Sequence, residues 1–265
     1  MVRKTRLVAA VAAVSIALAA CGGGSSSDTT VAAGAVETIT EGKLTVCSDA
    51  PYEPFEYQAE DKTWTGFDMD VLHKIAAAND LTLEVTVQPF DGIWLAPAAG
   101  KCDMVASSMS ITAERQANAD FTQSYFDSYQ SLLVRNADKD TLTTVASLSG
   151  KTLAVQTGTT GEAFAKDNVP DAKIKSFDDA SAMFLALESN QVDGVLQDFP
   201  INAYRAVKQG TSAVSITFDT AGTEPDHYGF SVKKGNTALL NMLNKGLDDL
   251  KASGDYDTIH AKYFG

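Results

Sequence analysis

The sequence has few basic residues, few cysteines and a single long hydrophobic run. Its 265 residues include 21 Lys and Arg against 34 Asp and Glu, which gives a formal net charge of −13. Such an acidic surface repels nucleic acid and anionic lipid and keeps a protein soluble, so we expect no nucleic-acid partner. The histidines (His73, His227 and His260) lack metal-ligand spacing, and neither a P-loop nor a Gly-x-Ser-x-Gly motif occurs. The sequence therefore predicts no metal, no cofactor and no serine nucleophile.

The hydrophobic run spans residues 7–20 and follows the basic "MVRKTR". It is too short for a typical membrane-spanning helix and suits the core of a signal peptide. The adjoining "LAAC" resembles a bacterial lipobox, which implies that residues 1–20 are removed and that Cys21 is lipidated. The alternative is an ordinary signal peptide with an incidental cysteine. Residues 21–40, rich in Gly, Ser, Thr and Ala, are predicted to form a flexible tether, so we expect an extracytoplasmic protein anchored to the membrane by lipid.

From residue 43 onward, short apolar segments typical of strands alternate with longer helical patterns. This order predicts an α/β fold with mainly parallel sheets. The first set has expected strands at 43–47, 81–87 and 103–107 and expected helices at 66–80 and 92–100. The second set has expected strands at 151–156, 172–177 and 193–197 and expected helices at 161–167, 179–190 and 201–209.

The two sets resemble each other in sequence. Residues 95–108 align with residues 185–198 without gaps, and Asp103 matches Asp193. This supports two lobes of similar topology. An expected strand at 227–234 and the helical residues 236–265 would return to the first lobe. We therefore predict lobe 1 at 41–133 and 225–265 and lobe 2 at 134–224, joined by crossings near 132–136 and 223–228 that act as a hinge.

The cysteines Cys47 and Cys102 remain after Cys21 is assigned to the lipid. An oxidising compartment favours their pairing. However, Cys47 is expected near the end of one strand and Cys102 before the start of another, an offset that opposes a disulfide. The sequence leaves the pairing open.

The stretch "ASSMSITAERQ" places Arg115 behind the hydroxyl side chains of Ser107, Ser108 and Ser110. Thr112 is a good N-cap, so Arg115 lies in the first helical turn, where a cation is unfavourable for the helix dipole. An anionic ligand in front of that turn explains the arrangement, because Arg can hold a carboxylate with two hydrogen bonds. The alternative is a surface salt bridge from Arg115 to Asp120.

Other candidate ligand residues also follow predicted strands, where open α/β sheets bind ligands. Asp49 and Asp198 could accept hydrogen bonds from an ammonium group, or could simply cap helices or turns. The "GTTGE" stretch offers Thr159 and Thr160 at a helix start. The aromatic residues Tyr52, Phe55, Phe90 and Trp94 could form a wall, with one or two of them in the core. A carboxylate seat, an ammonium acceptor and an aromatic wall together describe a site for an α-amino acid.

Residues 43–264 resemble the bacterial extracellular solute-binding proteins of family 3, the polar amino acid receptors of ABC importers. The resemblance rests on "DAPYEPFEY", "GFDMDV", "SSMSITAERQ", "DFTQSYF", "LSGKTLAVQTGTT", "LQD" and "YDTIHAKYFG". It implies a type II periplasmic-binding fold whose two lobes close on one ligand. It assigns the ligand carboxylate to Arg115 and the ammonium to Asp198. The expected ligand-binding residues are Asp49, Tyr52, Phe90, Ser107, Ser108, Ser110, Arg115, Gln156, Thr159, Thr160 and Asp198.

Gln156 departs from the apolar residue or lysine found in some relatives, so it bears on which side chain is accepted. The candidate residues hold no second cation, so acidic ligands are disfavoured. Asp49 favours a basic side chain, and Gln156 suits glutamine or another neutral polar ligand, so we expect a basic or neutral polar amino acid, with preference for a basic one. We expect a monomer that delivers its ligand to an ABC permease. Two alternatives stay open: a secreted cyclohexadienyl dehydratase-like enzyme with Glu162 as general acid, and a sensor that acts through a partner.

Overall fold

The computed structural model of the chain describes residues 36–208, 213–217 and 224–265. The predicted signal peptide, the predicted lipidation site Cys21 and most of the predicted tether lie outside these residues. Folded structure begins before the predicted end of the tether at residue 40. Val36 packs against the core, and the Ile39 amide donates a 2.7 Å hydrogen bond to Asp103. None of the helices in the described ranges combines the length and apolar composition needed to cross a bilayer.

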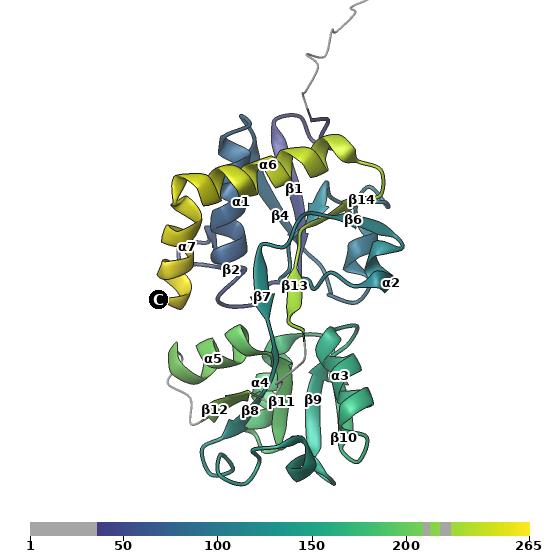
Figure 1. Ribbon diagram of the computed structural model, residues 1–265, viewed down its shortest axis with the longest axis vertical. Coiled ribbons are helices and arrows are strands. Elements are labelled where there is room, and N and C mark those ends of the chain that lie inside the picture. The colour runs from purple at the N-terminus through teal and green to yellow at the C-terminus, as the bar shows by residue number, and fades with distance from the viewer. Residues whose placement is uncertain (1–35, 209–212, 218–223) are drawn as a thin grey trace, which may run out of the picture. The chain divides into compact units, whose positions relative to one another are not determined.

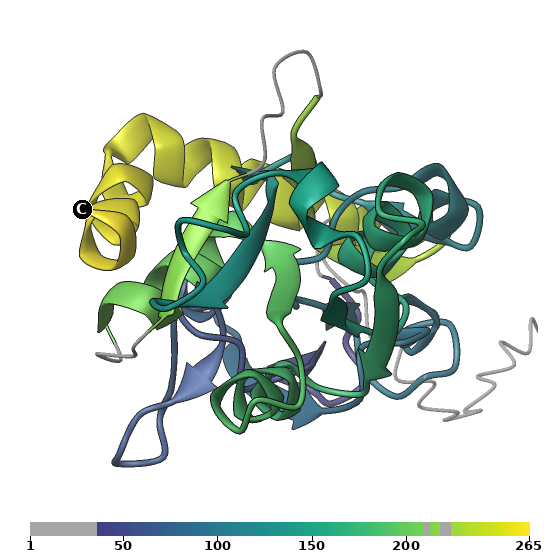
Figure 2. The same cartoon turned by 90° about the horizontal axis from the view of Figure 1, so that it is seen from below.

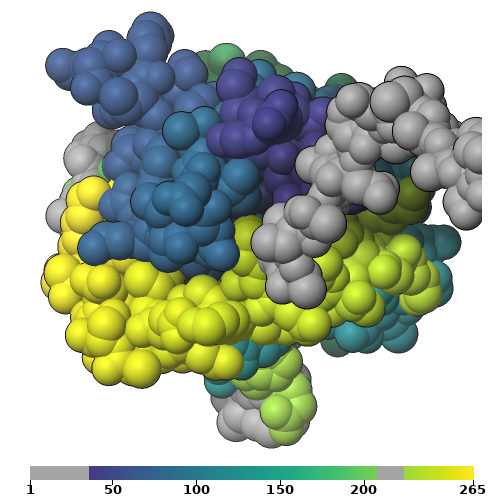
Figure 3. All heavy atoms as spheres, turned by 90° about the horizontal axis from the view of Figure 1, so that it is seen from above, coloured from purple at the N-terminus to yellow at the C-terminus, as the bar shows by residue number. Residues whose placement is uncertain are grey.

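Lobe 1 is built on a five-stranded sheet in the order β4-β1-β5-β14-β6 (Figure 1). Only β14 runs against the common direction, because it pairs antiparallel with both of its neighbours. Helix α1, which connects β1 to β4, packs against α6 and α7, and Figure 3 shows these C-terminal helices spread beside it. The bounds are β1 Lys43–Ser48, α1 Phe67–Ala77, β4 Thr82–Val87, β5 Met104–Val105, α2 Ala113–Gln116, β6 Ala119–Phe121, β14 Ser231–Lys233, α6 Thr237–Ser253 and α7 Asp255–Phe264.

Lobe 2 repeats this arrangement in the order β10-β9-β11-β8-β12, and here only β8 runs against the others. Strand β10 lies on one side of β9 and β11 on the other, so the connections through α3 and α4 run in opposite directions along the sheet. Because both connections are right-handed, α3 and α4 cover opposite faces of this sheet. Figure 2 shows helices on both sides of these strands. The bounds are β8 Gln130–Arg135, β9 Thr152–Gln156, α3 Thr160–Asn168, β10 Lys173–Phe177, α4 Ala180–Glu188, β11 Gly194–Asp198, α5 Phe199–Lys208 and β12 Ala213–Thr217.

The chain crosses between the lobes on two strands that pair with each other. These are β7 (Phe126–Ser128) and β13 (Asp226–Tyr228), an antiparallel ribbon that is visible between the lobes in Figure 1. The first crossing comes earlier than the predicted 132–136, because β8 already belongs to the lobe 2 sheet from Gln130. The second crossing agrees with the predicted position.

Three expected elements differ from the structure. Residues 92–100, expected to be a helix, form only a single 3₁₀ turn at Ile93–Leu95 followed by turns. The expected strand at 227–234 is divided into β13 and β14. The expected C-terminal helix is also divided, between α6 and α7, because Gly254 has a φ of 81° and ends α6 in the left-handed conformation. Two short strands, β2 (Tyr57–Gln58) and β3 (Trp64–Thr65), form a hairpin before α1 that was not expected.

Cys47 and Cys102 form a disulfide, with their Cα atoms 5.8 Å apart. The sequence argument against pairing took the residues before the strand, including Cys102, to extend straight along the strand direction. Instead β5 begins only at Met104, and Val105 pairs with Cys47. The bend before β5 brings Cys102 back over β1, so the two side chains meet.

A cluster of aromatic rings anchors the hinge ribbon to lobe 1. Phe126 of β7 lies 5.0 Å from both Phe55 and Phe264 between ring centroids, and 5.7 Å from Tyr228 of β13. Phe55 and Tyr228 are fully buried. Gly66 starts α1 beside this cluster, where a Cβ would lie 2.2 Å from the carbonyl oxygen of Phe55, so only glycine fits.

Candidate functional site

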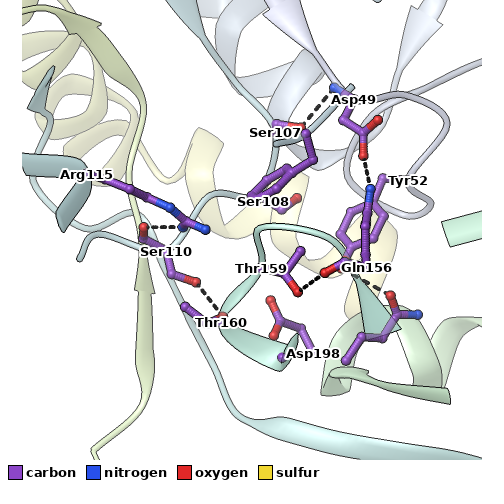
Figure 4. Close-up of a pocket in the computed structure, with 13 residues that line it drawn as sticks. Asp49, Tyr52, Ser107, Ser108, Ser110, Arg115, Gln156, Thr159, Thr160 and Asp198 are labelled. Atoms are coloured by element: carbon purple, nitrogen blue, oxygen red, sulfur yellow. Dashed lines mark hydrogen bonds between the residues drawn. The ribbon is translucent and has the colours of Figure 1, made fainter. Parts of the chain in front are cut away.

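A cavity of about 410 Å³, including the open space at its mouth, lies where the two lobes meet (Figure 4). Every residue that the sequence analysis proposed for ligand binding lines it, and they come from both lobes. Gly161, a glycine of the "GTTGE" stretch, and Gln197, which was not among the predicted ligand residues, complete the wall. The lining residues are Asp49, Tyr52, Phe90, Ser107, Ser108, Ser110, Arg115, Gln156, Thr159, Thr160, Gly161, Gln197 and Asp198.

Arg115 enters the cavity from the short helix α2. The Thr112 hydroxyl caps this helix by accepting a hydrogen bond from the Arg115 amide, as predicted. The guanidinium donates to the carbonyl of Ser110 at 2.7 Å and, across the cleft, to that of Gly158 at 3.0 Å. Its carbon lies 5.1 Å from the ring centroid of Phe90. These contacts hold the guanidinium group in place. No carboxylate among the described residues forms a salt bridge with it.

The alternative of a surface salt bridge between Arg115 and Asp120 is wrong. Arg115 is only 3% exposed, and Asp120 instead accepts a hydrogen bond from the Gly235 amide. Burial lowers the pKa of Arg115, and the acidic residues Asp198 and Asp226 act in the opposite direction. A buried guanidinium without a paired anion carries a large desolvation cost, so the arrangement favours a ligand that brings a negative group.

The serines of the "SSMS" stretch hold the loop above the cavity in place. The Ser107 hydroxyl accepts from the Asp49 amide at 2.9 Å, and the Ser110 and Thr160 hydroxyls lie 3.4 Å apart across the two lobes. Ser108 has a φ of 45° and donates its hydroxyl to Glu56 at 3.0 Å. Sequence reasoning missed Glu56 and its buried neighbour Asp68, which accepts from the Ser108 amide.

Asp198 lies at the end of β11, on the lobe 2 side of the cavity. Its carboxylate accepts a 2.5 Å hydrogen bond from the Gln130 amide nitrogen and another from the Tyr228 hydroxyl. Burial raises the pKa of Asp198 to about 7, and the nearby charge of Asp226 adds to this rise. Hydrogen bonds from Tyr228 and Gln130 and the charge of Arg115 oppose it. A cation held against this carboxylate would favour its ionised form.

Asp49 and Gln156 meet across the cleft, one from each lobe. The Gln156 amide nitrogen donates to the Asp49 carboxylate at 2.5 Å (Figure 4). Burial raises the pKa of Asp49 to about 6; the hydrogen bond from Gln156 opposes this rise, and the charge of Asp179 adds to it. Beside this pair, the Tyr52 hydroxyl lies 3.5 Å from the side-chain oxygen of Gln197, again between lobes.

Some of the remaining candidate residues line the cavity, and others pack behind its walls. Thr159 caps α3 through a hydrogen bond from the Glu162 amide, and its own hydroxyl donates to the carbonyl of Gln156. Of the four aromatic residues considered, Tyr52 and Phe90 line the cavity and Phe55 is part of the core. Trp94 lies behind Arg115, with its ring centroid 5.2 Å from the guanidinium carbon.

Some site residues that were not predicted lie next to predicted ones in the sequence, and others are far from them. Gln197 adjoins Asp198, which was named, so the same motif contained it. Gln130 lies on β8 and Tyr228 on the crossing strand β13, both far in sequence from Asp198, and no local pattern connects them to it. Only the folded chain brings them to the site.

The charges of the cavity suit a zwitterion. Among its lining residues Arg115 is the only cation, and Asp49 and Asp198 are the only acids. Arg115 and Asp198 stand on different lobes, so a ligand that bridges them is held most strongly when the lobes are closed. The hydroxyls of Ser110 and Thr160, which also line the cavity, can donate further hydrogen bonds to a ligand.

Known proteins show the same sequence pattern and fold. The chain is 34% identical over 227 residues to a probable histidine-binding protein of Campylobacter jejuni, with 86% of this chain and 87% of that protein aligned. The crystal structure of an ancestral amino-acid-binding protein, described as a precursor of cyclohexadienyl dehydratase, is 34% identical and has a TM-score of 0.78. The match covers 84% of this chain and 96% of that one. An ancestral arginine-binding protein bound to glutamine is also 34% identical, with a TM-score of 0.78, and covers 85% and 99% of the two chains.

The model of one protein family matches residues 44–265, which include both lobes and the whole cavity lining. This match agrees with the family resemblance found in the sequence motifs. The chain belongs to the bacterial extracellular solute-binding proteins of family 3.

Proposed function

We propose that this protein binds one L-amino acid between its lobes and delivers it, chemically unchanged, to an ABC importer. The observation that carries the proposal is the pair formed by Arg115 and Asp198, which face one cavity from opposite lobes. The guanidinium would hold the α-carboxylate and Asp198 the α-ammonium. The names of the relatives, which bind histidine, arginine, cystine or glutamine, support an amino-acid ligand.

The proposed ligand has a basic or a neutral polar side chain, with preference for a basic one. Once the zwitterion occupies Arg115 and Asp198, Asp49 is the acid that remains in the cavity. It contacts the neutral Gln156 and no cation among the described residues. A cationic side chain would neutralise it, whereas an acidic side chain would meet a like charge.

Calorimetry against the twenty standard L-amino acids and L-ornithine tests both statements. We expect measurable binding of arginine, lysine, ornithine or histidine, with glutamine as the strongest neutral candidate. Tight glutamate binding without arginine or glutamine binding would contradict the proposed preference. Absence of binding by all of them would contradict the function itself.

The enzyme alternative draws some support from the relative described as a precursor of cyclohexadienyl dehydratase. Its candidate acid, Glu162, does not line the cavity. The Glu162 carboxylate accepts hydrogen bonds from Ser176 at 2.7 Å and Gly158 at 3.0 Å and pairs with Lys166. Partial burial acts to raise the pKa of Glu162, but these contacts together lower it, which is unfavourable for a general acid. We therefore infer binding without catalysis, and an assay for prephenate or arogenate turnover tests this.

We further propose that Cys21 anchors the mature protein to the cell membrane by lipid, and that the protein acts as a monomer. The lipobox-like "LAAC" after the hydrophobic run supports the lipid anchor. Cys21→Ser should move the protein from the membrane fraction into the soluble extracytoplasmic fraction without changing its affinity for ligand.

A further inference from the structure

The strand that returns from lobe 2 to lobe 1 carries two side chains toward the ammonium side of the cavity. Alternate residues of a strand share a face, so Asp226 and Tyr228 of β13 point one way and His227 points the other. Tyr228 donates its hydroxyl to Asp198. His227 instead lies in contact with Asp127 of the neighbouring strand β7, with 2.7 Å between the ring nitrogen and the carboxylate.

Gln130 connects Asp226 to Asp198. It is the first residue of β8 and lies directly opposite Asp198 in the antiparallel pair of β8 and β11. Its amide nitrogen donates to Asp198 at 2.5 Å and to Asp226 at 2.9 Å, so one neutral amide joins two carboxylates. The side-chain oxygen of Gln130 is buried without a hydrogen-bond partner in the described part of the chain. A buried oxygen without a partner is unfavourable. This cost accompanies the orientation of the amide in which its nitrogen contacts both Asp198 and Asp226.

The charges around Asp198 are unbalanced. The groups that face it are Asp226 and Tyr228 from β13, Tyr52 from lobe 1, and Arg115 from α2. Neither Asp198 nor Asp226 forms a salt bridge within the described residues. Two acids joined by an amide therefore create a negative potential that a single cation placed against Asp198 would relieve. Asp226 does not line the cavity, so it can act on a ligand only through this cluster.

We propose that Asp226 is a positioning residue of the ammonium seat, which strengthens the hold of Asp198 on a ligand ammonium through Gln130 and ties that seat to the hinge. This inference rests on the proposed function, because it assigns the α-ammonium to Asp198. It makes hinge strand β13 part of the binding machinery rather than only a connection. A ligand that fills the seat then stabilises the relative placement of β8, β11 and β13.

The first test follows Asp198 itself, without ligand. The carboxyl group is observed by carbon NMR in protein labelled at its aspartates and assigned by its loss in Asp198→Asn. In Asp226→Asn, which removes the charge but keeps an oxygen for Gln130, the Asp198 titration should move to lower pH. Glu224→Gln is the matched control, because it removes one charge from an exposed position on the same segment. An unmoved Asp198 titration in Asp226→Asn would overturn the proposal.

The second test measures affinity for L-arginine and L-glutamine between pH 5 and 9. An ammonium favours ionised Asp198, so wild-type affinity should rise as pH rises through the Asp198 titration and then level off. Asp226→Asn should reach its plateau at lower pH, with a plateau affinity about tenfold weaker because one attracting charge is lost. A uniform loss at every pH would indicate a merely structural role and contradict the proposal. If the wild type binds neither probe nor any other amino acid, the proposed function fails, and the ligand-free titration still decides the role of Asp226.

Discussion

The two lobes are built on the same plan, and their differences lie where the ligand is expected. In lobe 1 the first strand β1 lies between β4 and β5, and in lobe 2 the first strand β9 lies between β10 and β11. In both sheets an antiparallel strand, β14 or β8, lies next to the third strand of the unit. The aligned aspartates confirm the correspondence in atomic detail. Asp103 donates its amide to the carbonyl of Thr45 and accepts from its amide at 2.7 Å; Asp193 does the same with Thr152. The sequence match between residues 95–108 and 185–198 therefore reflects a shared structure.

Equivalent positions have acquired complementary chemistry. Asp49 follows Thr45 at the same distance in sequence as Gln156 follows Thr152, and these two side chains hydrogen-bond to each other across the cleft. Ser108 follows Asp103 as Asp198 follows Asp193, so a hydroxyl on one lobe corresponds to a carboxylate on the other. The shared scaffold positions the ends of the strands, and the residues placed there decide which group of the ligand each lobe holds.

The strongest test of this division removes one charged group from each lobe. Arg115→Ala should abolish amino-acid binding, since the ligand carboxylate would be buried without a partner at a cost of about 3–5 kcal/mol. Asp198→Ala should do likewise from lobe 2. Calorimetry measures both, and thermal unfolding checks that the variants are folded. Near-native affinity in either variant would refute the assignment of these charges. Arg115→Lys keeps the charge but loses the planar fork, so it should bind with intermediate affinity.

The disulfide is a second difference between lobes, because Cys47 and Cys102 both belong to lobe 1. It closes a loop with a sequence separation of 55 residues, for which the chain-entropy estimate is about 4 kcal/mol. Replacing both cysteines by serine should lower the free energy of unfolding by up to this amount, measured by urea denaturation. Hydrogen exchange should increase mainly in β1 and β5. Equal increases in lobe 2 would show that the lobes do not unfold separately.

The equivalent aspartates should differ in their contribution to stability. Asp103 is buried and also accepts hydrogen bonds from the Thr45 hydroxyl and the Ile39 amide, whereas the Asp193 side chain is 36% exposed. Asp103→Ala should therefore cost about 2–3 kcal/mol of unfolding free energy and Asp193→Ala about 1 kcal/mol. Urea denaturation measures both. Equal costs would mean that the additional hydrogen bonds of Asp103 contribute nothing.

The smallest expected effect concerns selectivity. Asp49→Asn should weaken arginine binding about tenfold and leave glutamine binding nearly unchanged, because only the cationic side chain needs the charge. The pKa of Asp49 is raised to about 6, so arginine affinity in the wild type should rise as pH rises through that value. In the variant this part of the pH dependence should vanish. Calorimetry with both amino acids decides, and equal losses for arginine and glutamine would contradict the role of Asp49 in selectivity.

Local patterns predicted much of the fold. Thr112 caps its helix as the sequence predicted, and of the two candidates Thr159 and Thr160 it is Thr159 that caps α3, because a hydroxyl before a helix bonds within its own turn. The strands of both repeats lie close to their predicted ranges for the same reason: alternation and apolar runs are properties of neighbouring residues. The helix expected at 92–100 was wrong, since the segment holds two glycines and a proline and the chain there forms only turns.

Features that depend on distant residues needed the tertiary structure. The sequence by itself determined the α/β order, the internal repeat, the family resemblance and the residues that converge on the cavity. The folded chain decided that Cys47 reaches Cys102, that the hinge begins at β7, and that Gln130, Tyr228 and Asp226 stand behind Asp198. The physical reason is that capping and strand patterns are short-range, whereas a disulfide, a crossing point and a buried hydrogen-bond cluster join residues whose separation along the chain carries no signal.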